Sequence, residues 1–280
     1  MIDYHIHADY SIDAEGTIEQ FCEVAIDRGL KEIAFTTHVD GDRTGQDHFV
    51  MVRGRKVDVK SGRWLEEYES HVRTAAEGFS ESGLKVLLGA ELDCYPGVEH
   101  DLPERFFSTD FDIILGSVHL IDHVAISDGN RAKQILQRYS AQELGSKYFT
   151  TLLEAVECGH FDVLAHLDLY KRFGEQHYGD IVADLWRPHI EELAAKMRKN
   201  RIGFEINTSP WRRGGTEAMP GPKLMGALVE LGIVTITLGT DAHRPEDVGT
   251  GISRAIDELK KIGVNTITRF EKRRPKQTKI

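Results

Sequence analysis

The 280-residue sequence has only three cysteines and no apolar run long enough to cross a bilayer, a span of about 20 residues. The cysteines, Cys22, Cys94 and Cys158, are too scattered for a disulfide framework or a thiolate zinc site, so we expect reduced thiols. No basic and then apolar signal region precedes the first expected strand. We therefore expect a cytoplasmic protein that has no membrane partner.

The chain also lacks an excess of basic residues, because its formal net charge is -10. Broad nucleic-acid binding needs a basic face, so this charge argues against a nucleic-acid partner. It does not argue against an anionic substrate, since bound metal ions would dominate the local field. The basic stretch 272–279 is the local exception. We expect it to belong to a solvated C-terminal tail, residues 264–280.

Expected strands and amphipathic helices alternate about seven times, with no linker and no break in composition. Capping boxes, Thr17 with Gln20 and Ser140 with Glu143, mark the start of two of the helices. Residues 39–63 show no periodicity and are expected to form a long loop, a candidate cover for an active site. The expected strands are residues 2–7, 31–38, 84–92, 111–120, 161–166, 202–207 and 233–240. This alternation predicts one parallel α/β domain over residues 1–280.

Histidines and carboxylates stand at the carboxyl ends of these strands. His5 and His7 are one residue apart, so in a strand both side chains point to the same side. Asp13 follows shortly after the first strand, whereas the sixth strand, ending in residues 205–209, offers no obvious ligand. The candidate ligands are His5, His7, Asp13, His38, Glu91, His119, His166, Asp241 and His243. A closed parallel barrel gathers such ends on one rim, whereas an open sheet would spread them along a line, so a TIM-like barrel is predicted.

Buried histidines satisfied by hydrogen bonds are the simpler explanation of this group. Without metal, however, so many clustered imidazoles and carboxylates would leave polar groups desolvated. The donors are too many for one tetrahedral ion and suit two or three divalent ions, with Glu91 able to bridge two. Nitrogen and oxygen donors fit zinc, manganese and iron alike.

Such a cluster suits phosphoester hydrolysis, because the ions lower the pKa of a bound water that attacks phosphorus and neutralise charge on the phosphate oxygens. Arg212 or Arg213, just after the sixth strand, would bind the phosphate, with Lys171 and Arg172 as a second candidate pair. The candidate catalytic residues are Glu91, Asp241 and His243. Asp241 or His243 could protonate the leaving alcohol, although both suit a ligand role better.

The strand-end motifs resemble those of the polymerase-and-histidinol-phosphatase (PHP) superfamily. The motifs are His5-Ile6-His7, Thr36-Thr37-His38, Gly89-Ala90-Glu91, Gly116-Ser117-Val118-His119, Ala165-His166-Leu167-Asp168 and Thr240-Asp241-Ala242-His243. The resemblance, over residues 2 to about 263, implies a distorted (β/α)7 barrel with three metal ions. It implies a first ion on His5, His7, Glu91 and Asp241, a second on Glu91, His119 and His166, and a third on Asp13, His38 and His243.

Within the superfamily, residues 165–174 and 205–209 look most like histidinol-phosphate phosphatases. The resemblance therefore implies hydrolysis of L-histidinol phosphate, a small phosphorylated substrate, in histidine biosynthesis. Two departures stand out. Thr37 occupies a position where Asp commonly precedes the histidine, and Pro210-Trp211 replaces a small or apolar pair before the arginines.

Three alternatives stay open at the level of the sequence. A phosphoesterase for nucleotides or other small esters would use the same cluster, although the acidic chain disfavours long nucleic acids. A metal amidohydrolase is disfavoured by a bridging Glu91 and by His38 as an extra ligand. An inactive metal-binding barrel would be expected to lack ligands, and none is missing. The oligomeric state is not predicted.

Overall fold

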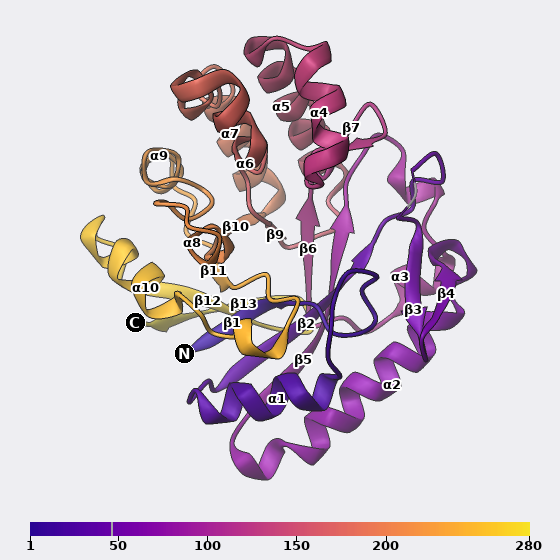
Figure 1. Ribbon diagram of the computed structural model, residues 1–280. Helices are drawn as coiled ribbons and strands as arrows, with labels where there is room; N and C mark the ends of the chain where they lie inside the picture. Colours follow the sequence, from indigo (N-terminus) through magenta and orange to yellow (C-terminus); the bar gives the residue numbers. More distant parts are fainter. Residues whose placement is uncertain (46) are drawn as a thin grey trace.

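A single parallel sheet of seven strands forms the centre of the computed structural model, which describes residues 1–45 and 47–280 (Figure 1). The order of the strands in the sheet follows their order in the chain, and each pairs in parallel with the next. The strands are β1 (Ile2–Ile6), β2 (Glu32–Val39), β5 (Lys85–Asp93), β6 (Ile113–Ser117), β9 (Val163–Leu164), β10 (Gly203–Asn207) and β11 (Ile236–Gly239). All seven lie where the sequence predicted them.

The first strand meets the segment after the last one, so the sheet curls into a nearly closed barrel. The His7 amide donates to the Ala242 carbonyl at 2.8 Å, and the Ala242 amide donates to the His5 carbonyl at 3.2 Å. Ile6 and Ala242 form a parallel bridge. The predicted distorted, TIM-like (β/α)7 barrel in a single domain is confirmed.

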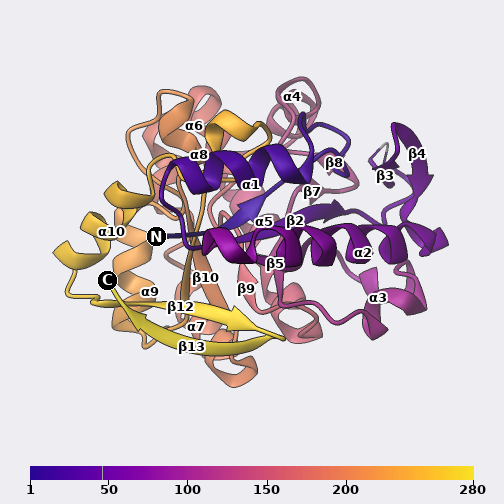
Figure 2. The same ribbon diagram turned by 90° about the horizontal axis from the view of Figure 1, so that it is seen from below.

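Helices cover the outside of the barrel, as Figures 1 and 2 show from two directions. The longer ones are α1 (Ile18–Asp27), α2 (Arg63–Gly78), α4 (Gly129–Arg138), α5 (Ala141–Cys158), α6 (Lys171–Tyr178), α7 (Ile190–Asn200), α9 (Pro222–Glu230) and α10 (Ile252–Lys261). Both predicted capping boxes are present, at the start of α1 and of α5. The apolar side of α1 buries Phe21, Cys22 and Ala25, and the three cysteines are free thiols.

Short elements connect the larger ones. They are the helices α3 (Glu104–Ser108) and α8 (Ser209–Arg212), the 3-10 turns η1 (Val59–Ser61), η2 (Ser80–Ser82), η3 (Val98–His100), η4 (Gly179–Asp184) and η5 (Pro245–Asp247), and the hairpin β7 (Leu120–Ile121) with β8 (Val124–Ala125). Over residues 1–45 and 47–280, every helix is too short or too polar to cross a bilayer.

The prediction of one long loop over residues 39–63 is wrong. This segment contains an antiparallel hairpin, β3 (Phe49–Val52) with β4 (Arg55–Asp58), which buries Val50. The connecting residues Arg53 and Gly54 both have positive φ angles, as the two central residues of a tight hairpin turn require. Arg-Gly is a weaker turn signal than Asn-Gly or Asp-Gly, so the pattern did not reveal the hairpin.

The prediction of a solvated C-terminal tail is also wrong. Residues 264–280 contain the hairpin β12 (Thr266–Glu271) with β13 (Arg274–Lys279), which lies below the barrel in Figure 2. Ile267 and Phe270 are buried, and the Phe270 amide donates to the Tyr4 hydroxyl. The basic residues of the stretch 272–279 are exposed, and their number obscured the two apolar anchors. The hairpin covers the amino ends of the strands, opposite the predicted ligands.

Candidate metal centre

Four of the predicted ligands converge inside the barrel at its carboxyl rim. His5 Nε2 lies 3.4 Å from Glu91 Oε2 and 3.7 Å from Asp241 Oδ1. His7 Nε2 lies 3.5 Å from each of the same two oxygens. An ion with tetrahedral bonds of about 2.1 Å has ligand atoms about 3.4 Å apart. The spacing of these four atoms therefore fits one bound ion.

Three buried atoms of this group have no hydrogen-bond partner among the described residues. The unpaired atoms include His5 Nε2, His7 Nε2 and Glu91 Oε2, and all three side chains are almost fully buried. Leaving a buried polar atom unpaired costs about 1–3 kcal/mol. A divalent cation placed among them would satisfy all three at once, so the residues present fit a metal ion.

A second group lies on the other side of the Glu91 carboxylate. Glu91 Oε1 is 2.8 Å from His166 Nε2 and 3.4 Å from His119 Nε2, and the two imidazole nitrogens are 3.3 Å apart. Since Oε2 faces the first group and Oε1 the second, the carboxylate is placed to bridge two ions.

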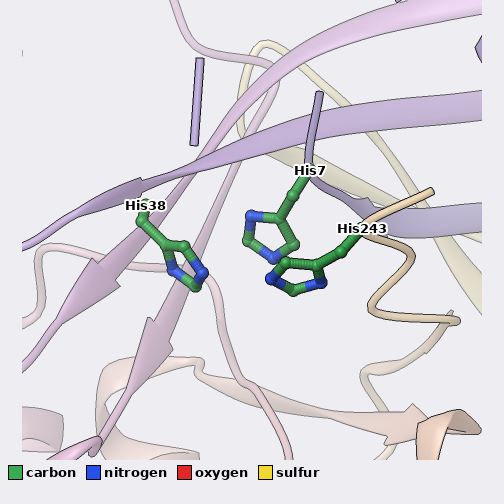
Figure 3. Close-up of side chains that lie close together, drawn as sticks. All are labelled: His7, His38 and His243. Carbon is green, nitrogen blue, oxygen red and sulfur yellow. The ribbon is translucent and has the colours of Figure 1, made fainter. Parts of the chain in front are cut away.

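A third group lies nearer to solvent. The two oxygens of the exposed Asp13 face His38 Nε2 at 3.6 Å and His243 Nε2 at 3.3 Å. Figure 3 shows the rings of His7, His38 and His243 gathered side by side, with nitrogens turned toward one another. The structure thus brings all nine predicted ligands together.

At Glu91, Asp241 and His7, the surroundings favour the protonation states that metal binding needs. Burial raises the pKa of Glu91, but His5, His119 and His38 outweigh it and hold that pKa well below its ordinary value. Burial also raises the pKa of Asp241, which His5 and His7 bring well below normal. Burial, with His38 and His243 nearby, lowers the pKa of His7. Ionised carboxylates and a neutral imidazole are metal-ligating forms.

Two of the ligands occupy an unusual backbone conformation. His166 has a φ of 27° and Asp241 a φ of 54°, in the left-handed region that costs a non-glycine residue about 1–3 kcal/mol. The guanidinium of Arg212 donates to the Thr240 carbonyl and, at 3.0 Å, to the Asp241 carbonyl. Arg212 therefore holds the backbone that aims Asp241 into the cluster.

Glu205, in strand β10, supports the ligands although the sequence analysis assigned it no role. Its Oε1 lies 2.7 Å from His5 Nδ1, and its Oε2 accepts from the His166 amide at 3.0 Å. Only a glycine fits at 239, because a Cβ there would come within 1.9 Å of Glu205 Oε1. A carboxylate between two apolar residues of a buried strand, Phe204 and Ile206, was the signal that could have identified Glu205.

A pocket of about 830 Å³ opens above the cluster, with His38, His119, His166, Asp241 and His243 among its lining residues. Arg172, Arg212, Arg213 and Arg244 also line it. Lys171 does not, because its ammonium is 3.3 Å from both Asp168 and Glu217. From the segment 39–63, Val39, Asp40 and Asp47 line the pocket.

The PHP domain family model matches residues 3–209, about three quarters of the sequence. The chain belongs to the PHP domain family. This PHP domain protein is 30% identical over 279 residues to a probable histidinol-phosphatase of Deinococcus radiodurans, with 98% of this chain and 99% of the relative aligned. It is 26% identical over 270 residues to a histidinol-phosphatase of Lactococcus lactis, with 96% of this chain and 94% of the relative aligned.

A crystal structure of the Lactococcus lactis histidinol phosphate phosphatase, complexed with zinc, L-histidinol and phosphate, superposes on this PHP domain protein with a TM-score of 0.81. The two chains are 25% identical, and the match covers 98% of each. The likeness therefore extends beyond residue 209, across the segment that carries Arg213, Asp241 and His243.

Proposed function

We propose that this chain is a metal-dependent phosphomonoesterase that hydrolyses L-histidinol phosphate to L-histidinol and phosphate, a step of histidine biosynthesis. The observation that carries the proposal is the set of unpaired histidine and carboxylate atoms at the floor of an arginine-lined pocket. Similarity along the full chain to histidinol-phosphatases supports it. A cytoplasmic location stays a prediction.

Three groups of side chains are proposed to hold three divalent ions. The ligands are His5, His7, Glu91 and Asp241 for the first, Glu91, His119 and His166 for the second, and Asp13, His38 and His243 for the third. Zinc, manganese and iron suit these donors, and zinc is present in the Lactococcus lactis relative. Ions bound there would supply positive charge to the phosphate oxygens and lower the pKa of a water molecule.

Arg213 is the proposed phosphate ligand from the chain itself. Its guanidinium donates to Ser209 Oγ at 2.8 Å, which leaves further donors for the pocket. Burial, with Arg172 nearby, lowers the pKa of Arg213 to about 10, so it stays charged at neutral pH. Arg212 instead uses its donors on two carbonyls and lies 3.4 Å from Asp247. Arg172 is the second candidate.

We assign neither of the two predicted proton donors to the leaving alcohol, because both are proposed metal ligands. The low pKa of Asp241 keeps it ionised, so it has no proton to give to the leaving alcohol. Burial lowers the pKa of His243, but Asp13 and Asp241 outweigh this effect and raise it, and an ion bound to His243 would displace the resulting proton.

The test is phosphate release by the metal-loaded protein from L-histidinol phosphate, other phosphomonoesters, phosphodiesters and amides. We expect kcat/KM for L-histidinol phosphate to exceed that for the other esters by orders of magnitude. Preference for another monoester, a diester or an amide would favour the corresponding alternative. An absence of turnover despite full metal loading would indicate an inactive metal-binding barrel.

The arginine assignment is tested by comparing Arg213→Ala with Arg212→Ala. Arg213→Ala is expected to weaken competitive inhibition by inorganic phosphate by about 10- to 100-fold, the effect of losing charge-assisted hydrogen bonds. Arg212→Ala is expected to lower metal content and stability more than phosphate affinity. The opposite pattern would assign the phosphate to Arg212.

A further inference from the structure

Two carboxylates, Asp40 and Asp93, lie side by side one layer above the metal centre. In the β2–β5 ladder His38 pairs with Glu91 and Val39 with Leu92, so Asp40 and Asp93 come next on the two strands. Side chains alternate along a strand, which turns both carboxylates to the same inner side as His38 and Glu91. Both line the pocket, with exposed fractions of only 7% and 3%.

Neither carboxylate has an arginine or lysine partner among residues 1–45 and 47–280. Asp40 Oδ1 accepts from the Asp42 amide at 2.7 Å, and Asp93 Oδ1 accepts from the His119 amide at 2.9 Å. In the described part of the chain, the second oxygen of each accepts no hydrogen bond. The imidazole Nδ1 of His119, a proposed metal ligand, lies 3.8 Å from Asp93 Oδ1.

Other carboxylates on the pocket wall are paired with arginines. Asp47 lies 2.6 Å from the guanidinium of Arg131, and Asp247 lies 3.4 Å from that of Arg212. In the described residues, Asp40 and Asp93 lack such an arginine partner. Ionising two neighbouring buried carboxylates without a partner is costly, and a cation bound between them would supply the partner that the described residues do not.

Asp40 and Asp93 lie across the barrel from Arg172 and Arg213. Asp40 and Asp93 follow β2 and end β5, whereas Arg172 and Arg213 follow β9 and β10, on the opposite side of the ring of strands. The His119 ring connects the two layers, since its Nε2 is 3.4 Å from Glu91 and its Nδ1 is 3.8 Å from Asp93. A cation held by Asp93 would therefore be separated from the metal-ligating atoms by about the width of the His119 ring.

We propose that Asp40 and Asp93 bind an ammonium group on the alcohol part of the substrate while the metal centre and Arg213 bind its phosphate. The site is then selective for phosphate monoesters of amino alcohols, with the amine only a few bonds from the ester oxygen. This inference rests on the proposed phosphatase function and names the feature of the substrate that the pocket recognises.

The experiment compares L-histidinol phosphate with the phosphate ester of imidazole propanol, which lacks only the amine. The metal-loaded wild type is expected to prefer the amine-bearing ester by about 10- to 100-fold in kcat/KM, mainly through KM, as one charge-assisted hydrogen bond allows. Asp93→Asn and Asp40→Asn should each bring the ratio of the two kcat/KM values close to one. Asp47→Asn is the matched control, because Asp47 lines the same pocket but is paired with Arg131. This variant should keep the wild-type preference for the amine-bearing ester.

Unchanged preference in both variants would overturn the proposal. An equal fall of kcat with both esters would overturn it too, because Asp93 would then act only by orienting His119. Calorimetric titration of the metal-loaded protein with L-histidinol and with imidazole propanol, both in inorganic phosphate, separates this inference from the phosphatase function. Amine-dependent binding that Asp93→Asn abolishes would support the acidic site even without hydrolysis, whereas equal binding of the two alcohols would refute it.

Discussion

At the scale of single residues, the strongest evidence is the set of buried atoms that the protein leaves unpaired. His5 Nε2, His7 Nε2 and Glu91 Oε2 are enclosed, yet each faces another potential metal ligand instead of a hydrogen-bond partner in the described residues. Glu91 contributes to two groups because its two oxygens face opposite ways. A hydrogen-bonded core would have satisfied these atoms internally.

Glu205→Gln is expected to weaken metal binding by about 10- to 100-fold without unfolding the protein. The substitution keeps the shape of the side chain but removes the negative charge that orients His5 at 2.7 Å. Metal affinity is measured by competition with a chelator, and Glu217→Gln, a change at an exposed carboxylate, serves as the control. Equal affinities in all three proteins would show that Glu205 has only a packing role.

Apparent metal affinity should increase with pH up to about 9. Burial lowers the pKa of His38, but Asp13 and Glu91 outweigh burial and raise it to about 9. A metal ion binds neutral imidazole and must displace this proton at any pH below that value, so affinity should rise about tenfold per pH unit for this group. Chelator competition between pH 6 and 10 checks this, and a constant affinity between pH 7 and 9 would contradict it.

At the scale of elements, one end of the barrel carries the candidate ligands and the other end is covered by a hairpin. The carboxyl ends of the strands carry the ligands, and the β12–β13 hairpin covers the amino ends. Ile236 donates its amide to Thr268 Oγ1 at 3.1 Å, and Arg269 pairs with Glu32. The hairpin therefore supports the fold at a distance from the chemistry.

Phe270→Ala is expected to lower the free energy of unfolding by about 3–5 kcal/mol, because it empties a buried site between the hairpin and the barrel. Lys276→Ala, at an exposed position of the same hairpin, should change stability by less than about 0.5 kcal/mol. Denaturant midpoints measure both. A small effect of Phe270→Ala would mean that the hairpin is dispensable for stability.

At the scale of the whole molecule, residues from both ends of the chain meet in one site. His5 and His7 lie close to Asp241 because hydrogen bonds join β1 to the segment after β11. Ion binding would thus connect the first and last strands of the barrel, and the metal should contribute to global stability as well as to catalysis.

Removal of metal by a chelator is expected to lower the thermal midpoint, and return of zinc or manganese to restore it. Binding to the folded state alone stabilises it by about 4 kcal/mol when free metal exceeds the Kd a thousandfold. Differential scanning calorimetry of chelated, reconstituted and untreated protein measures the shift. Identical midpoints would argue against occupied ion sites in the folded protein.

Local patterns in the sequence were sufficient to predict the seven strands, the barrel and all nine candidate ligands. Strand periodicity and the position of histidines at strand ends both depend on residues that are close together in the chain. The hairpins β3–β4 and β12–β13 were missed, since β3–β4 has a weak turn signal and the apolar anchors of β12 are outnumbered by basic residues.

Only the tertiary structure decided the roles of Glu205, Arg212 and the Asp40–Asp93 pair. Each depends on contacts between residues far apart in the chain, such as Glu205 with His5 or Asp40 beside Asp93. The adjacent residues Arg212 and Arg213 were equivalent in the sequence. In the structure, Arg212 donates to two carbonyls just after the seventh strand, whereas Arg213 donates to Ser209 and keeps further donors for the pocket. The neighbours of a side chain in space determine which of its hydrogen-bond donors are occupied. For Arg212 those neighbours are far away in the sequence, so the sequence alone could not separate the two arginines.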